Sequence, residues 1–202
     1  MKNTFSLPEG FQHAFTLDLQ KNKKQALLVN GLALLIGVLL WLVSFPLMVS
    51  SLTASWRTGG MWFLQLMVFS ISILAYLPLH ELVHGLFIRR YSGKRAHYGF
   101  TWLYAYAGSK AFFCKQDYFI IALSPVVFWG VVFALLAFVL PLPWFWVAYG
   151  LEIVNLSGAA GDLYVIGRLC RLPSSLLVQD SGLSMDIYLP APSGASKPEA
   201  DL

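Results

Sequence analysis

The sequence predicts an all-α integral membrane protein with four spanning helices and room for a short extended or β segment in the middle loop. Three observations predict this class. First, 57% of the 202 residues are hydrophobic and 12% are charged, whereas soluble domains have about 25% charged residues. Second, long segments of the chain carry no charge. Third, the basic residues gather in segments that four spans would place on one side of the membrane.

Charge-free segments hold the predicted spans. Asp, Glu, Lys and Arg are missing from residues 25–56, 58–80 and 118–151. A spanning helix needs about 20 mainly apolar residues, so each segment is long enough for one. Pro141 and Pro143 divide the third segment with a tight turn. The predicted spans are therefore about 26–50, 61–88, 119–140 and 143–167.

The positions of Lys and Arg predict the orientation of these spans. Thirteen of the 14 basic residues lie before the first span, between the second and third spans, or after the fourth, and the exception is Arg57. Basic residues of membrane proteins concentrate in cytoplasmic segments. We therefore predict a multi-pass protein of the cell membrane with both termini in the cytoplasm. We expect no nucleic-acid partner, because no basic patch alternates with aromatic residues in an exposed segment.

Three parts of the chain follow from this topology: a cytoplasmic N-terminal segment (1–25), a four-span membrane domain (26–167) and a cytoplasmic C-terminal tail (168–202). The first apolar run has no small-residue cleavage pattern and is long enough to remain as an anchor. We expect disorder after about residue 190, where the sequence is small, polar and proline-containing. Cys114 and Cys170 both fall on the predicted cytoplasmic side, where a disulfide is not expected.

The second predicted span contains the strongest chemical motif. His80-Glu81-Leu82-Val83-His84 is an H-E-x-x-H pattern, and histidines at i and i+4 project from one face of a helix. Two such imidazoles can bind one Zn²⁺, and Glu81 beside them can act as the general base toward the attacking water. The alternative is a helix whose histidines bond only to nearby hydroxyls. We favour the functional interpretation, because ionisable groups at membrane depth cost at least about 2.5–3.5 kcal/mol on insertion scales.

Catalytic zinc usually has three protein ligands, and Asp162 is the predicted third. Asp162 lies five residues before the end of the fourth span, and His84 lies four residues before the end of the second. At about 1.5 Å per residue, both lie about 6–8 Å below the same interface. Two alternatives stay open. Asp162 could instead pair with Arg168 or reach the interface, and His97 of the middle loop could be the third ligand.

Asn155 and Glu152 are further polar residues of the fourth span. Asn155 precedes Asp162 by seven residues, so both lie on one helical face. We expect Asn155 to face the active-site cavity, where it would donate to a substrate carbonyl or orient the site. Glu152 lies one turn deeper, where it could line a water path or support the residues of the site.

The middle loop is aromatic and partly alternating from His97 to Ala107. An extended segment at this place could pair with an unwound substrate strand by β-addition. Alternatively, Trp102, Tyr104 and Tyr106 could sit at the level of the lipid headgroups, as aromatic belts do. The two interpretations are compatible.

These motifs resemble a bacterial family of zincin peptidases that was once catalogued as a domain of unknown function. The resemblance covers most of residues 26–190 and rests on five segments: HELVHG (80–85), GKRAHYGFTWLYAYAG (93–108), LSP (123–125), NLSGAAGD (155–162) and VQDSGLSMDIYLP (178–190). More broadly, the chain is similar to site-2 proteases, in which an H-E-x-x-H helix and an Asp on a distant helix hold zinc near the cytoplasmic face. That similarity implies zinc ligation by His80, His84 and Asp162, with Glu81 as the base. Site-2 proteases carry their Asp beside a proline, whereas Asp162 lies in Ala-Gly-Asp-Leu.

The predicted function is zinc-dependent hydrolysis of peptide bonds near the cytoplasmic face of the membrane. The expected partners are membrane lipids and a membrane-protein or peptide substrate. One alternative is a membrane metalloenzyme that uses the same residues on another amide or an ester. The other is a catalytically inactive metal-binding scaffold or regulator. A fourth protein ligand would favour the scaffold, and an open coordination position would favour an enzyme.

Overall fold

The computed structural model describes residues 3–19, 21–101 and 105–191. Most of this part of the chain is helical. The helices are α1 (Lys23–Arg57), α2 (Met61–Ser92), α3 (Lys115–Val139), α4 (Phe145–Gly158) and α5 (Ala160–Cys170), with a 3-10 turn, η1, at Leu142–Trp144. The strands are β1 (Phe11–Leu17), β2 (His97–Phe100), β3 (Ala105–Gly108), β4 (Phe112–Cys114), β5 (Leu177–Asp180) and β6 (Met185–Pro190). The all-α prediction is therefore too narrow, because strands form in the terminal segments as well as in the middle loop.

Three helices are long and apolar enough to cross a membrane: α1, α2 and α3, with 35, 32 and 25 residues. At about 1.5 Å per residue, even a 25-residue helix extends about 38 Å, which exceeds the hydrocarbon core of about 30 Å. Large apolar side chains are exposed along these helices, as contact with lipid tails requires. The three helices correspond to the first three predicted spans.

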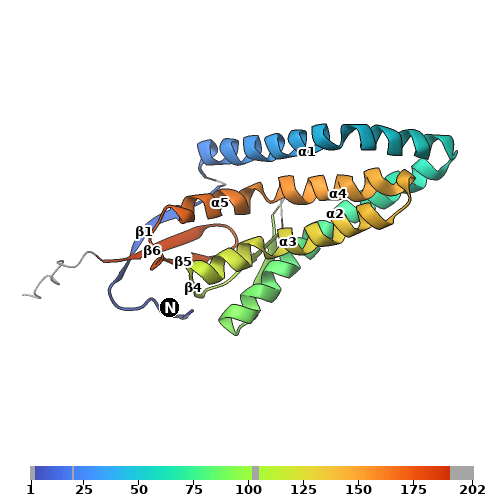
Figure 1. Cartoon of the computed structure of the whole chain (residues 1–202). Helices are drawn as coiled ribbons and strands as arrows, with labels where there is room; N and C mark the ends of the chain where they lie inside the picture. Colours follow the sequence, from blue (N-terminus) through green and yellow to red (C-terminus); the bar gives the residue numbers. More distant parts are fainter. Residues whose placement is uncertain (1–2, 20, 102–104, 192–202) are drawn as a thin grey trace, which may run out of the picture.

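The predicted fourth span is two helices rather than one. The regular helix is interrupted at Ala159, whose φ is −77° and ψ is 6°. Its N–H still donates to the carbonyls of Asn155 and Ser157, so α5 follows α4 closely, and both lie between α1 and α3 (Figure 1). With 14 and 11 residues, each helix is shorter than the length that spans a bilayer by itself. That residues 143–167 form a fourth span stays a prediction.

Buried polar side chains hold the end of the bundle where η1 leads into α4. The Ser51 hydroxyl of α1 donates to the Leu142 carbonyl at 2.7 Å. The Pro143 carbonyl accepts from the Ser55 hydroxyl at 2.7 Å and from Gln65 Nε2 of α2 at 3.0 Å. These contacts supply donors to carbonyls of the short turn, and they account for three buried polar residues in otherwise apolar helices.

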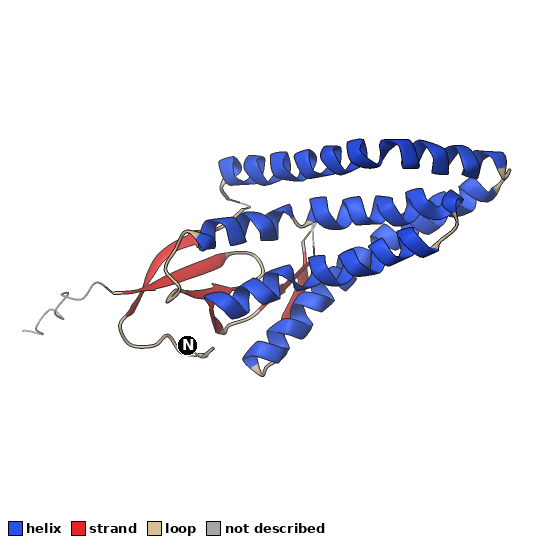
Figure 2. Ribbon diagram, viewed as in Figure 1, coloured by secondary structure: helices blue, strands red, loops and turns tan. Residues whose placement is uncertain are grey.

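A four-stranded antiparallel sheet lies at the other end of the bundle (Figure 2). Its strand order is β1-β6-β5-β4, so the N-terminal segment, the C-terminal segment and the end of the middle loop build one sheet. Phe11 pairs with Pro190, and Phe113 pairs with Val178. Thr4 adds a single bridge to Phe112 beside β4. The terminal segments, predicted only as cytoplasmic flanks of the membrane domain, are therefore part of the fold.

The main hydrophobic core lies between this sheet and the ends of α2, α3 and α5. Its fully buried sheet-side residues are Phe113, Leu176, Val178 and Ile187. They meet Ile88 of α2, Ile121 of α3, and Val165 and Leu169 of α5. Burial of such side chains contributes about 1.5–3 kcal/mol each. The sheet thereby holds together the ends of α2, α3 and α5.

A separate two-stranded hairpin, β2–β3, occupies the middle loop and packs against α2. It pairs His97 with Gly108 and Phe100 with Ala105, and its position agrees with the extended segment expected there. Trp102 and Tyr104, which the aromatic-belt interpretation names, lie outside the described residues.

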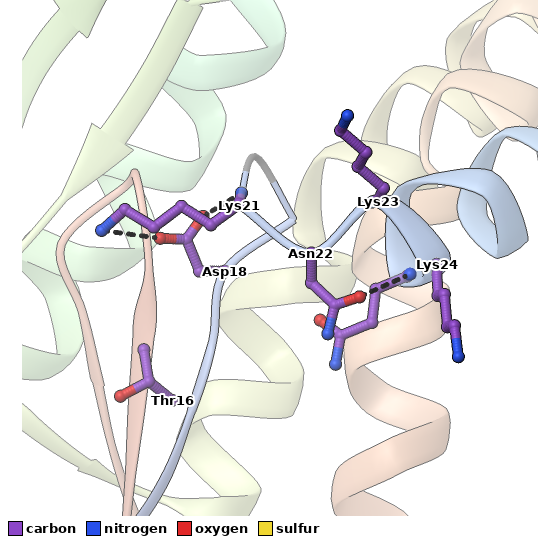
Figure 3. Close-up of a pocket in the computed structure, with 7 residues that line it drawn as sticks. Thr16, Asp18, Lys21, Asn22, Lys23 and Lys24 are labelled. Carbon is purple, nitrogen blue, oxygen red and sulfur yellow. Dashed lines mark hydrogen bonds and ion pairs between the residues drawn. The ribbon is translucent and has the colours of Figure 1, made fainter.

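The start of α1 carries basic side chains beside a shallow pocket (Figure 3). The Asn22 side chain caps the helix by accepting from the Gln25 N–H at 3.2 Å. Lys21 pairs with Asp18 at 3.4 Å, while the Lys23 side chain points in a different direction (Figure 3). The ion pair of Lys21 and the separate direction of Lys23 are typical of a solvated, basic helix start, which often flanks a membrane span.

Candidate metal centre

Three predicted ligand side chains lie together although they come from two helices far apart in sequence. His80 and His84 lie on α2, and Asp162 lies in the first turn of α5. The Nε2 atom of each histidine is 3.7 Å from the same oxygen, Oδ2 of Asp162. The side chains are largely enclosed, with 12%, 12% and 23% of their surfaces exposed. The interruption at Ala159 places Asp162 at a helix start, where the helix dipole stabilises a carboxylate.

This arrangement fits a metal ion better than direct hydrogen bonds. A distance of 3.7 Å exceeds the range of about 2.7–3.2 Å for an N–H···O bond. Tetrahedral zinc with ligands at about 2.0–2.2 Å separates neighbouring ligand atoms by about 3.3–3.6 Å. The ligand atoms of His80, His84 and Asp162 all lie within 4.8 Å of one another. Two imidazoles and a carboxylate are also the donor types of many catalytic zinc sites, so these residues fit zinc.

Each histidine is held through its other ring nitrogen. Nδ1 of His84 lies 3.0 Å from the Ile121 carbonyl of α3. Nδ1 of His80 lies 2.8 Å from the Tyr76 hydroxyl, one turn earlier on α2. Each ring is therefore anchored at Nδ1 and presents Nε2 to Asp162.

Glu81, the predicted base, lies under the β2–β3 hairpin. The backbone N–H of Ala107 in β3 lies near its carboxylate. Tyr98 of β2 packs so closely over Gly85 that a Cβ at this position would overlap the tyrosine ring. Burial raises the pKa of the Tyr98 hydroxyl, and the negative charge of Glu81 raises it further. The hairpin thus covers the HELVHG segment and contacts its acidic residue.

The turn between β5 and β6 supports this hairpin from the sheet. The Ser109 N–H donates to the Asp180 carbonyl at 2.7 Å, and His97 Nε2 lies 3.0 Å from the Ser181 carbonyl. The Asp180 carboxylate accepts from the Tyr118 hydroxyl at 2.8 Å and from the Gly182 N–H at 2.7 Å. The segment VQDSGLSMDIYLP (178–190) therefore links the hairpin to α3.

The alternatives for the third ligand occupy other positions. His97 lies on β2 and contacts Ser181. In the described ranges, the group of side chains that could hold one metal ion comprises His80, His84 and Asp162. Within the same ranges Asp162 faces the two histidines, and no ion pair joins it to Arg168.

Asn155 and Glu152 lie away from the ligand atoms. Asn155 is fully buried, and its Nδ2 donates to the Val126 carbonyl of α3 at 3.1 Å. Its Oδ1 accepts from the Tyr76 hydroxyl at 2.9 Å, so it contacts His80 through Tyr76. Glu152 lies beside Gly130 of α3, and its buried Oε2 has no hydrogen-bond partner among the described residues.

The sequence did not predict that Tyr76 and Ala107 lie beside the candidate site. For Tyr76 a signal existed, because residues 76, 80 and 84 follow one another at four-residue intervals on one face of α2. For Ala107 no side-chain signal could exist, because only its backbone N–H lies near Glu81.

Comparison with known proteins supports the nature of this centre. A family model described as "Putative zincin peptidase" matches residues 73–177, just over half of the chain. The matched range includes His80, Glu81, His84 and Asp162, together with the hairpin. No curated protein and no solved structure matches the chain.

Proposed function

The chain belongs to this zincin peptidase family, and on that premise we propose that it is a membrane-embedded zinc metallopeptidase acting near the cytoplasmic face. One observation carries the proposal. The Nε2 atoms of an H-E-x-x-H helix both lie 3.7 Å from one oxygen of Asp162. This helix is long and apolar enough to cross a membrane.

The residues divide the chemistry between holding the metal and moving a proton. His80, His84 and Asp162 would hold zinc through two Nε2 atoms and a carboxylate oxygen. Bound zinc would supply Lewis acidity toward the scissile carbonyl and lower the pKa of a coordinated water. Glu81 would take one proton from the attacking water and return it to the nitrogen of the leaving amine. The nearby Ala107 N–H would help to orient Glu81 before substrate arrives.

We extend the proposal to the topology, with four spans and both termini in the cytoplasm. Helices α4 and α5 follow one another and would together form the fourth span. Strands β1, β4 and β6 belong to one sheet, and a sheet cannot cross the bilayer to reach its partners. The sheet therefore supports a topology in which the N-terminal segment, the middle loop and the C-terminal segment share one side. Their basic residues support the cytoplasmic side. A zinc site split between an H-E-x-x-H helix and a distant Asp-bearing helix also supports a relation to site-2 proteases.

The β2–β3 hairpin is the proposed docking element for an extended substrate segment. Each strand of a two-stranded sheet has one unpaired edge, to which a peptide strand could add. The contact between Ala107 and Glu81 would bring such a strand close to the base. Exposed Tyr98 and Phe100 could in addition contact the headgroup region.

The test combines metal analysis with proteolysis. The purified full-length protein is expected to contain about one zinc ion per chain, and Asp162→Ala should lose it. Full zinc occupancy in Asp162→Ala would show that the third ligand is wrong. Cleavage is measured by mass spectrometry on a mixture of synthetic peptides that carry hydrophobic segments, in proteoliposomes. Glu81→Gln should keep zinc and lower cleavage by about 10²–10⁴-fold, whereas Glu9→Gln, in the N-terminal segment, should behave as wild type.

The same experiment separates the two alternatives. Ester or other amide turnover without peptide cleavage would indicate a different metalloenzyme. Zinc binding with no turnover of any of these compounds, and equal behaviour of Glu81→Gln and wild type, would indicate a scaffold. Unchanged peptide turnover in Glu81→Gln would contradict the proposed role of this carboxylate.

A further inference from the structure

We infer that residues of α2, α3 and α4 preset both metal-facing histidines with the proton on Nδ1, so that Nε2 is free to bind. Tyr76 and Asn155 would do this for His80, and Pro125 would do it for His84. The inference rests on the proposed zinc site. It adds positioning residues that are neither zinc ligands nor the general base.

The orientation of the Asn155 amide is determined by a backbone carbonyl. The Val126 carbonyl can only accept a hydrogen bond, and the amide atom of Asn155 that lies 3.1 Å from it must therefore be Nδ2. The other end, Oδ1, then faces the Tyr76 hydroxyl at 2.9 Å. An amide oxygen can only accept, so the hydroxyl must donate to it.

The proton of Tyr76 determines the tautomer of His80. A tyrosine hydroxyl has one proton, and Tyr76 gives it to Asn155. Toward His80 Nδ1, 2.8 Å away, the hydroxyl can therefore only accept, and Nδ1 must carry a proton. The Tyr76 ring is buried against Trp129 and Phe133, which limits its movement toward other partners. Neutral His80 is thus left with a lone pair on Nε2, the atom that faces Asp162.

A proline determines the tautomer of His84. In a regular helix the carbonyl of residue 121 accepts from the N–H of residue 125, but Pro125 has no N–H. The freed Ile121 carbonyl accepts instead from His84 Nδ1 at 3.0 Å and from the Ser124 hydroxyl at 2.8 Å. His84 Nδ1 must donate to this carbonyl, so neutral His84 also has its lone pair on Nε2, opposite Asp162. The LSP segment thereby acquires a role in the site.

Preset tautomers matter because a metal binds the lone pair of a neutral imidazole. Partners on the far nitrogen of a ligating histidine typically change metal affinity by about 10–100-fold. Removal of the Tyr76 hydroxyl should therefore weaken zinc binding by about 10–100-fold while leaving all three ligands in place. Pro125→Ala should weaken binding through His84, because the new N–H would compete for the Ile121 carbonyl.

The first test measures metal affinity in the full-length protein in detergent. Zinc dissociation constants from competition with a chromophoric chelator are compared for wild type, Tyr76→Phe and Pro125→Ala. The matched controls are Tyr149→Phe, which loses a hydroxyl bonded to Leu40 of α1, and Pro46→Ala within α1. The controls should remain within twofold of wild type. The absorption bands of the Co²⁺-substituted protein should change in Tyr76→Phe and Pro125→Ala only. Wild-type affinity and spectra in both of these variants would overturn the inference.

The second test needs no metal and separates this inference from the proposed function. At a pH at which both rings are neutral, nitrogen-15 NMR of histidine-labelled, metal-free protein distinguishes the two neutral tautomers. We expect the Nδ1–H form at His80 and His84 in wild type, a mixture at His80 only in Tyr76→Phe, and a mixture at His84 only in Pro125→Ala. The Nε2–H form at both positions in wild type would refute the inference. Failure of the wild type to bind zinc, with the Nδ1–H forms present, would refute the proposed function and leave the tautomer assignment supported.

Discussion

Replacing Asp180 by alanine removes the acceptor that links the turn between β5 and β6 to α3. The carboxylate accepts from the Tyr118 hydroxyl and from the Gly182 N–H. Tyr118 is only 3% exposed, so its hydroxyl has little access to water, and Met185 Sδ at 3.0 Å is a weaker acceptor. A buried donor left without an acceptor costs about 1–3 kcal/mol, and the more accessible Gly182 N–H adds less. We expect Asp180→Ala to lower the free energy of unfolding by about 2–4 kcal/mol.

Thermal unfolding of the purified protein in detergent measures this loss. For a chain of 150–250 residues, about 1 kcal/mol corresponds to about 2–4 °C in Tm, so the expected decrease is about 4–16 °C. Asp180→Asn keeps one acceptor and should lose less than half as much. The control is Asp186→Asn on β6, whose side chain is more exposed and should contribute less than about 1 kcal/mol. A Tm of Asp180→Ala within about 2 °C of wild type would refute the reasoning.

The pH dependence of the same pair gives an independent check. Burial raises the pKa of Asp180. A carboxyl whose pKa is higher in the folded than in the unfolded protein stabilises the fold fully below its ordinary pKa of about 3.9. That contribution is lost as the pH rises through the folded-state pKa. Since Asp180→Asn cannot ionise, the Tm of wild type relative to this variant should fall between pH 4 and pH 7. A constant difference would contradict the raised pKa.

Three further predictions concern the hairpin, the metal and the core. Gly85→Ala should lower peptide cleavage, because its Cβ would overlap the Tyr98 ring. The same change should have little effect on cleavage in a Tyr98→Ala background. Equal losses of cleavage in both backgrounds would exclude the overlap as the cause. Removal of zinc with a strong chelator should lower Tm, and added zinc should restore it. If zinc had been present at 100 times its dissociation constant, the lost stability corresponds to about 2.7 kcal/mol. An unchanged Tm would argue against a metal bound to the folded state. Phe113→Ala, at a fully buried position of the sheet, should lower the free energy of unfolding by about 3–5 kcal/mol in thermal or denaturant unfolding. A loss below about 1 kcal/mol would indicate that the sheet does not unfold together with the helices.

The long helices could be predicted because their signal is local. An uninterrupted apolar run of sufficient length favours a helix in a membrane whatever its neighbours are, since each backbone group finds its partner within the same segment. Helices α1, α2 and α3 accordingly occur where charge-free runs are longest. The interruption at Ala159 was not predicted. Gly158 lies immediately before it, but a glycine within an apolar segment is equally typical of close helix packing.

The four-stranded sheet could not be predicted, because its signal is not local. Strand β1 pairs Phe11 with Pro190, at opposite ends of the chain. Strands of three to seven residues are too short to give a clear pattern in the sequence, and only the partner strands satisfy their backbone groups. The sheet matters for the site because the turn between β5 and β6 supports the hairpin that contacts Glu81.

The sequence by itself determined that His80 and His84 share one face of a helix, because a helical backbone places residues i and i+4 on one face in any surroundings. It also predicted that Asp162 lies at a similar depth in the membrane, because helix rise is constant, and this depth stays a prediction. Only the tertiary structure decided that Asp162 points between the two histidines and which nitrogen of each ring stays free. Those outcomes depend on the interruption at Ala159 and on contacts between residues 37 and 79 positions apart. A histidine tautomer is set by whichever donor or acceptor touches the ring. Tyr76 reaches His80 through helical spacing, whereas Asn155 reaches Tyr76, and Ile121 reaches His84, only through packing between helices.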